Sequence, residues 1–323
     1  MWDNGRSAVG VKYDMGKHAD TAAIAAILDA FVEKRLAGVV RTGAIPRILH
    51  QTYPNKMLPE PLAGNVVTLR ARNPDWDYRL YDDTDIERFI AEEYGPSVLE
   101  RYLRISPSYG AARADLFRYL LIYRFGGLYL DIKSTADRPL SDVFGPADHF
   151  VISQWDNAPG REHEIWGLHP DLSHVPGGEF QQWFIASAPG HPFLRAAIER
   201  VLRNIDRYNP FRDGVGLEVV RVTGPIAYTF AIEPLLDRHP HRRVTSEAAL
   251  GLRYSVMAYH AHHAHFRGHY SQRMTPIVGE TRGKVSQAVL TGYIHARRHV
   301  GRIIKHAKYM YSRIRGQPVI LTQ

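Results

Sequence analysis

The sequence predicts an α/β domain built on a mostly parallel sheet, and three observations support this fold class. Residues 108–125 carry Ala, Leu and Tyr at helical spacing. Gly126-Gly127 ends the helix that this pattern predicts. The apolar segment 128–132 follows at once as a strand that ends in charge. Because ligands bind beyond the carboxyl ends of strands in such sheets, Asp131 is a candidate binding residue.

Two strands and a helix precede this unit. Residues 45–53 have the composition of a short strand, and residues 75–81 alternate with period two as a second strand. The acidic run 82–85 supplies capping side chains for a helix over 86–93. Further expected elements are an irregular leader over 1–16, a helix over 20–36, long loops over 144–178, and helices over 193–208, 226–238 and 284–315.

The chain of 323 residues is long enough for one large domain or two small ones. We expect a leader and helix over 1–44, a main domain over 45–280 and a basic amphipathic helix over 281–323. The absence of cysteine excludes disulfides and Cys-based zinc sites, and fits a reducing cytoplasm. The N-terminal residues do not match a signal peptide, and no apolar run reaches the length of a membrane span.

Positive charge is concentrated at the C-terminal end. No Asp or Glu follows Glu280, whereas nine Lys and Arg do, so the first 280 residues hold 32 basic against 33 acidic side chains. Together with an apolar stripe at three- and four-residue steps, this pattern is typical of a helix that lies on an anionic membrane surface. The alternative is a helix that packs its stripe on the main domain. The near-neutral body argues against a nucleic-acid partner.

A group of motifs resembles a known family. Residues 112–119 (ARADLFRY) and 126–131 (GGLYLD) resemble the DXD sugar-binding-region glycosyltransferases of glycosyltransferase family 32, whose core is similar to that of the clostridial glucosylating toxins. The resemblance continues, in the order of the family, through residues 45–51, 73–83, 182–192 and 223–225. It implies a GT-A fold, a Rossmann-like and mostly parallel sheet with flanking helices, here with helical extensions at both ends. It also implies retention of the anomeric configuration.

The resemblance also implies roles for individual residues. Asp115 would bind the ribose or base side of the nucleotide, and Arg118, one helical turn later, would sit by the same carboxylate and the donor sugar. Tyr129 would contact the diphosphate or sugar, and Asp131 would take the first DXD position. Tyr53 would stack on the base. The implied catalytic residues are Asp131, Arg118 and Gln182, and the implied donor-binding residues are Tyr53, Asp115, Arg118, Tyr129, Asp131, Lys133 and Tyr270.

One departure from the motif bears on the metal. The second DXD position is Lys133, and strand periodicity predicts that it faces the same side as Asp131. An ammonium group cannot ligate a metal but can pair with diphosphate oxygens. A divalent cation, Mn²⁺ or Mg²⁺, therefore stays an open expectation, with Asp131, His265 and His269 as the candidate ligands.

The resemblance predicts a retaining glycosyltransferase that moves a hexosyl or N-acetylhexosaminyl unit from a UDP- or GDP-sugar to a glycan or glycolipid hydroxyl. We expect it in the cytoplasm, peripheral at the inner face of a membrane. The alternative is a weakly catalytic binding protein for a nucleotide sugar or glycan on the same fold. Several residues also allow ordinary interpretations. Asp115 and Arg118 would form a surface ion pair, Lys133 would be a solvated lysine, and Tyr53, Trp155, Trp166 and Trp183 would be core residues rather than sugar or base platforms.

Overall fold

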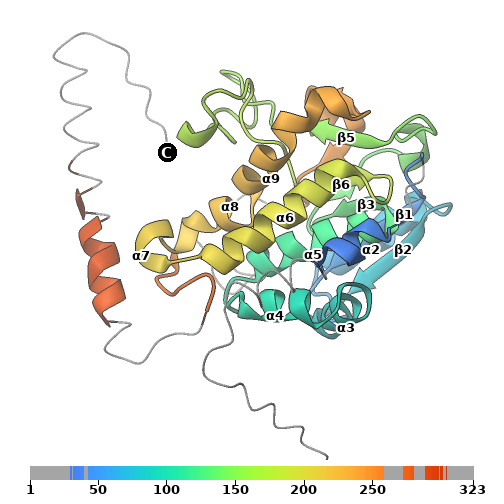
Figure 1. Ribbon diagram of the computed structural model, residues 1–323. Helices are drawn as coiled ribbons and strands as arrows, with labels where there is room; N and C mark the ends of the chain where they lie inside the picture. Colours follow the sequence, from blue (N-terminus) through green and yellow to red (C-terminus); the bar gives the residue numbers. More distant parts are fainter. Residues whose placement is uncertain are drawn as a thin grey trace, which may run out of the picture.

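The computed structural model describes residues 30, 32–39, 43–257, 272–279, 288–297, 299, 300 and 303. Within these ranges the chain forms a six-stranded sheet covered by helices (Figure 1). The strands are β1 Ile48–Thr52, β2 Asp77–Tyr81, β3 Gly127–Leu130, β4 Thr135–Ala136, β5 Phe150–Ser153, β6 Phe184–Ser187, β7 Arg242–Val244 and β8 Leu252–Arg253. The α-helices are α2 Leu62–Arg72, α3 Asp83–Tyr94, α4 Pro96–Arg104, α5 Gly110–Phe125, α6 Pro192–Arg207, α7 Pro210–Asp213, α8 Val219–Val222 and α9 Pro225–Ile232. Short 3-10 helices occupy Leu140–Asp142, Pro170–Leu172, Gly216–Glu218, Glu233–Arg238 and Glu247–Leu250.

The main sheet has the order β2-β1-β3-β6-β5-β7. Strands β2, β1 and β3 pair in parallel, β6 pairs antiparallel with both β3 and β5, and β7 is parallel to β5. Strand β6 is therefore the one strand of this described sheet that runs against the others. The predicted α/β class, with a mostly parallel sheet and flanking helices, is confirmed.

Alternating side chains of the central strands divide the core into two layers. Tyr129 and Ile185 point to the side covered by α5, α6 and α9, whereas Leu128, Leu130 and Phe184 point to the side covered by α2. Helices α5, α6 and α9 pack against one another on the first side (Figure 1). Because α5 is enclosed by helices and sheet, it is buried almost all round, including its polar Asp115 and Arg118.

The structure changes several predicted boundaries. Helix α3 begins at Asp83, where the side chain of Asp82 accepts a hydrogen bond from the Asp85 N–H in a capping box. Strand β3 ends at Leu130, so Asp131 lies just beyond it. Strand β5 lies inside the segment 144–178, which was predicted as loops only, and the helix predicted over 226–238 becomes 3-10 after Ile232. Helices α2 and α4 were not predicted.

The predicted terminal helices are described in part. Residues 30 and 32–37 are helical at the N-terminal end, and residues 288–297 form a helix at the C-terminal end. The remaining residues of both predicted segments, and the leader over 1–16, lie outside the described ranges. Among the helices that are described, none is both long and apolar enough to cross a membrane.

Candidate active site

The turn between α5 and β3 determines which residues meet at the candidate site. The chain reverses direction at Gly126-Gly127, so β3 returns alongside α5. Arg118 lies about 10 Å before the helix end and Asp131 about 13 Å after the turn, from the rise per residue of a helix and a strand. The two side chains therefore stand at the same level, at the carboxyl end of β3.

Both glycines are needed for this reversal. Gly126 and Gly127 have φ of +65° and +99°, a region that other residues rarely adopt. A Cβ atom on Gly127 would lie 2.5 Å from the carbonyl oxygen of Ile48 in β1. The close approach of β3 to β1 thus depends on the missing side chain.

Arg118 is the centre of the candidate site. Its Nη1 donates to the carbonyl oxygen of Gln182 at 2.7 Å, and its Nη2 lies 3.2 Å from Oδ1 of Asp131 and 3.4 Å from Oδ1 of Asp115. The guanidinium carbon lies 4.7 Å from the centre of the Tyr129 ring. Burial by itself lowers the pKa of Arg118, but the neighbouring Tyr129, Asp131 and Asp115 raise it above its ordinary value, so the group stays charged.

Asp115 is buried and connects Gln182 with Thr223 through its two carboxylate oxygens. Its Oδ1 accepts from Nε2 of Gln182 at 3.0 Å, and its Oδ2 accepts from the hydroxyl of Thr223 at 2.9 Å. Burial raises the pKa of Asp115, while Arg118 and the two hydrogen bonds oppose the rise. With 3% of Asp115 and 4% of Arg118 exposed, the interpretation of these residues as a surface ion pair is wrong.

Asp131 is the partly open carboxylate of the group. Its side chain is 22% exposed, and its Oδ1 accepts from the Tyr129 hydroxyl at 3.3 Å. The backbone is held on both sides, because its N–H donates to the carbonyl of Trp183 at 2.8 Å and its carbonyl accepts from Nε2 of Gln51 at 3.1 Å. A fixed backbone with a partly open, charged side chain is the arrangement expected of a ligand-binding carboxylate.

Lys133 does not lie on a strand, contrary to the prediction. It belongs to a turn after β3, in which the N–H of Ser134 donates to the carbonyl of Asp131 at 2.8 Å. The ammonium group donates to the Tyr254 hydroxyl at 2.6 Å and lies 3.8 Å from the centre of that ring. The pKa of Lys133 is lowered from its ordinary value, mainly by burial. The Asp131 carboxylate opposes this fall, and the Arg118 guanidinium adds to it. Lys133 is therefore a half-buried cation beside Asp131 and Arg118, and the interpretation of it as a solvated lysine is wrong.

Gln182 belongs to this group, whereas Tyr53 lies against a separate apolar cluster. The side-chain amide of Gln182 joins Asp115 to the hydroxyl of Tyr119, which lies 3.0 Å from its Oε1. Tyr53 follows β1 directly and is half-buried against a small apolar cluster that includes Leu62 and Ile132. Tyr53 thus lies at the carboxyl end of β1, and Gln182 lies just before β6, which begins beside the carboxyl end of β3.

Metal binding has limited support among the described residues. Asp131 is flanked by Arg118 and Lys133, and these ranges contain no group of three or more His, Asp or Glu side chains arranged to hold a metal ion. Asp131 alone supplies too few oxygen ligands for a divalent cation, which needs several, so the described residues do not test the expected site. We therefore derive no step through a metal. His265, His269 and Tyr270 lie outside the described residues.

Aromatic residues extend the site on the far side of Lys133. The rings of Trp155, Trp166 and Trp183 lie 5.1, 5.9 and 5.5 Å from that of Tyr254. Trp155 and Trp183 are buried in the second core layer, as their alternative interpretation predicts, whereas Trp166 is only half-buried. No local pattern in the sequence marks Tyr254, so it was not predicted. Thr223 lies in the motif over residues 223–225, and that motif is the sequence feature that could have identified it.

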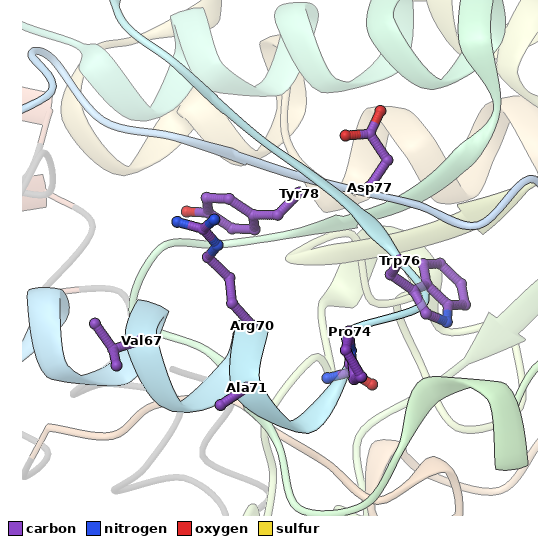
Figure 2. A pocket seen from close by; sticks show the side chains of 8 residues that line it. Val67, Arg70, Ala71, Pro74, Trp76, Asp77 and Tyr78 are labelled. Atoms are coloured by element: carbon purple, nitrogen blue, oxygen red, sulfur yellow. The ribbon is translucent and has the colours of Figure 1, made fainter.

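A separate cavity of about 520 Å³ lies between α2 and β2 (Figure 2). In it Arg70 lies over the Tyr78 ring, with 5.3 Å from the guanidinium carbon to the ring centre. None of the residues that line it is a predicted donor-binding residue. Its lining consists of Val67, Arg70, Ala71, Asn73, Pro74, Trp76, Asp77 and Tyr78.

Comparison with known proteins supports the motif. Residues 59–151 match the family described as "Glycosyltransferase sugar-binding region containing DXD motif". The chain is 30% identical, over 58% of its length and 44% of the relative, to inositol phosphoceramide mannosyltransferase 3 of Schizosaccharomyces pombe. It is 27% identical, over 48% of its length and 42% of the relative, to the initiation-specific alpha-1,6-mannosyltransferase of Candida albicans. The chain thus spans less than half the length of each of these relatives.

Two solved structures are also similar. The PaToxG glycosyltransferase shares 17% identity at a TM-score of 0.40, over 67% of this chain and 79% of that one. The UDP-bound glycosyltransferase domain from the YGT toxin shares 11% identity at a TM-score of 0.37, over 64% and 80%. The family match covers α2 to β5 and includes Asp115, Arg118, Tyr129, Asp131 and Lys133. Residues 59–151 therefore match the sugar-binding region of the DXD glycosyltransferases, and the resemblance to glycosyltransferase family 32 is confirmed.

Proposed function

We propose that this protein is a retaining glycosyltransferase that transfers a hexosyl or N-acetylhexosaminyl unit from a UDP- or GDP-sugar to a glycan or glycolipid hydroxyl. The observation that carries the proposal is Arg118, which is held between Asp115 and Asp131 over the Tyr129 ring, within the matched sugar-binding region. The names of both relatives favour mannose as the sugar, and the name of the Schizosaccharomyces pombe relative favours inositol phosphoceramide as the acceptor.

The charges of the group suit a donor that carries a diphosphate. Arg118 and Lys133 present two cations toward one partly open carboxylate, Asp131. In the proposed complex the two cations pair with diphosphate oxygens, and Asp131 accepts hydrogen bonds from sugar or ribose hydroxyls. The half-buried position of Lys133 strengthens such a pairing, because an ion pair is screened less away from water.

The proposed reaction proceeds at the face of the sugar that carries the leaving group. The bond between the anomeric carbon and the diphosphate oxygen breaks, and a bond to the acceptor oxygen forms on the same face. The acceptor proton passes to the departing phosphate oxygen, which Arg118 and Lys133 stabilise as charge develops. Gln182, near this face, cannot act as a carboxylate nucleophile, and the proposal assigns no covalent intermediate.

A second candidate is a nucleotide-sugar-binding protein with little turnover, and Lys133 in the second DXD position favours it. One experiment separates the two. A panel of nucleotide sugars is screened by thermal shift and by donor hydrolysis, with and without manganese. Stabilisation together with hydrolysis supports the transferase, stabilisation without hydrolysis supports the binding protein, and neither effect contradicts both. We also propose a cytoplasmic location, peripheral at the inner face of a membrane; fractionation of cells into soluble and membrane pools tests it.

A further inference from the structure

The helix over 288–297 is attached to the domain by one of its faces. Leu290 and Ile294 are only 4% and 5% exposed, and they pack with Val215, next to Phe211 and Met274. The Tyr293 hydroxyl donates to the carbonyl oxygen of Phe211 at 3.0 Å. Figure 1 shows this helix at the edge of the molecule, beyond α7. Leu290 and Ile294 are four residues apart, which is the spacing that places two side chains on the same face of a helix.

A second apolar stripe points away from the domain. Val289, Val300 and Ile303 are 59%, 53% and 56% exposed, whereas Tyr293, which is 42% exposed, contacts Phe211 of the domain and belongs to the attached face. At about 100° per residue the spacing of these three positions places them within an arc of about 60°, and the buried pair lies well outside it. This second stripe contains three members of the apolar pattern that the sequence predicts, and the described part of the domain leaves it exposed.

The charge of the segment selects the kind of partner. No Asp or Glu follows Glu280, whereas nine Lys and Arg do. A second copy of the same segment would bring like charges together, which disfavours pairing of two such helices. An anionic lipid surface offers both an apolar boundary for the stripe and negative charge that attracts the basic residues of this segment of the sequence.

We propose that the face formed by Val289, Val300 and Ile303 docks the protein on an anionic membrane. Because Leu290 and Ile294 fasten the same helix to the domain, docking holds the whole domain at the surface rather than tethering it by a loose tail. Leu217, 52% exposed and two residues after Val215, adds apolar surface close to the attachment. The proposal does not depend on the proposed transferase activity.

Flotation of the full-length protein with vesicles tests it. The protein is expected to float with vesicles of phosphatidylcholine and phosphatidylglycerol, and not with phosphatidylcholine alone. Binding should weaken as salt shortens the screening length from about 10 Å at 0.1 M to about 3 Å at 1 M. The V300S/I303S variant should bind the anionic vesicles about tenfold or more weakly, because it removes apolar surface from the stripe.

A matched control uses M57S/V67S, which changes two residues that are 82% and 69% exposed near α2. This control should bind vesicles like the unchanged protein. Equal binding by V300S/I303S and the control would overturn the proposal, as would failure of the full-length protein to bind at low salt. A fall in thermal stability or a loss of self-association confined to V300S/I303S would also overturn it, since the stripe would then contact protein. Donor hydrolysis, measured without vesicles, reports separately on the proposed function.

Discussion

Arg118 joins Asp115, Asp131 and Tyr129 through one guanidinium group. A buried guanidinium is stable only where its donors are paired, since an uncompensated buried charge costs several kcal/mol. These pairs hold Arg118 in position before any donor binds. A diphosphate at the open side of Asp131 would therefore meet a cation that needs little rearrangement, which is the condition for electrostatic stabilisation of a leaving group.

Asp131→Asn is expected to lower transfer or donor hydrolysis by about 10²–10³-fold, the effect of removing one preorganised electrostatic partner. The amide keeps an oxygen at the position of Oδ1 for the Tyr129 hydroxyl but removes the charge that faces Arg118. Stability should change by no more than about 1 kcal/mol, because the side chain is partly exposed. Steady-state kinetics and thermal unfolding check both parts. A variant that retains most of its activity, or that no longer folds, would contradict the assignment.

The second residue-scale prediction concerns metal dependence. If the Lys133 ammonium serves as the second cation for the diphosphate, donor hydrolysis by the unchanged protein should persist in EDTA. Lys133→Asp restores the second carboxylate of the motif and should make hydrolysis depend on manganese. Tyr254→Phe is the matched control, because it removes the hydroxyl that accepts from Lys133 and keeps the ring. An unchanged protein that is silent in EDTA, together with a fully active Lys133→Ala, would refute this role.

At the scale of elements, the site depends on the α5–β3 reversal rather than on either element alone. His50 of β1 lies within hydrogen-bond distance of the Gly126 carbonyl oxygen, at 3.1 Å from Nε2, and β1 pairs with β3 directly after the turn. The turn therefore aligns Arg118 with Asp131 and also joins α5 to the centre of the sheet. A change in this turn should affect stability and donor binding together.

Gly127→Ala tests this dependence. The new methyl group would sit 2.5 Å from the Ile48 carbonyl, at a φ of +99° that alanine rarely adopts. We expect a loss of at least about 1–3 kcal/mol in the free energy of unfolding, from backbone strain alone. Gly110→Ala, at the first position of α5 with no atom within 4 Å of the new Cβ, should leave stability unchanged or raise it slightly. Urea unfolding compares the two, and equal stabilities would disprove the argument.

At the scale of the whole molecule, a buried histidine makes stability depend on pH. His50 is 0% exposed, and its Nδ1 lies 3.1 Å from the Tyr81 hydroxyl while its Nε2 faces the Gly126 carbonyl. The neutral ring satisfies both contacts by accepting at Nδ1 and donating at Nε2. Burial lowers the pKa of His50 from 6.5 to about 3, and it also lowers that of His191 to about 4.

The sign of the pH effect follows from these pKa values. Between pH 6.5 and about 3 the unfolded chain binds a proton at His50 that the folded chain does not, so stability falls as pH falls. Each such histidine contributes a loss of at most about 1.4 kcal/mol per pH unit in this range. Urea unfolding is measured at several pH values. As pH falls, the free energy of unfolding should decrease less steeply in His50→Gln and in His191→Gln than in the unchanged protein. Parallel curves for both variants and the unchanged protein would contradict the prediction.

Local patterns in the sequence were sufficient for much of the fold. Helical spacing and the Gly-Gly pair located α5 and β3, period-two alternation located β2, and an acidic cap located α3 to within a few residues. These signals are local because helix and strand periods repeat within a few residues. Helix α2 escaped prediction because its apolar period is weak, and β5 because four buried residues among prolines and glycines give little alternation.

The sequence by itself determined the α/β class, the sugar-binding motif, the residues that carry it and the charge of the C-terminal segment. Only the tertiary structure decided how these parts meet. It inserted the antiparallel β6 between β3 and β5, gave Lys133 a partner 121 residues away, and placed Thr223 on Asp115. It also determined that Leu290 and Ile294, rather than Val289 and its neighbours on the other face, are buried on the C-terminal helix. Such choices depend on contacts between segments far apart in the chain, whose energies come from packing and charge pairing in three dimensions and leave no period in the local sequence.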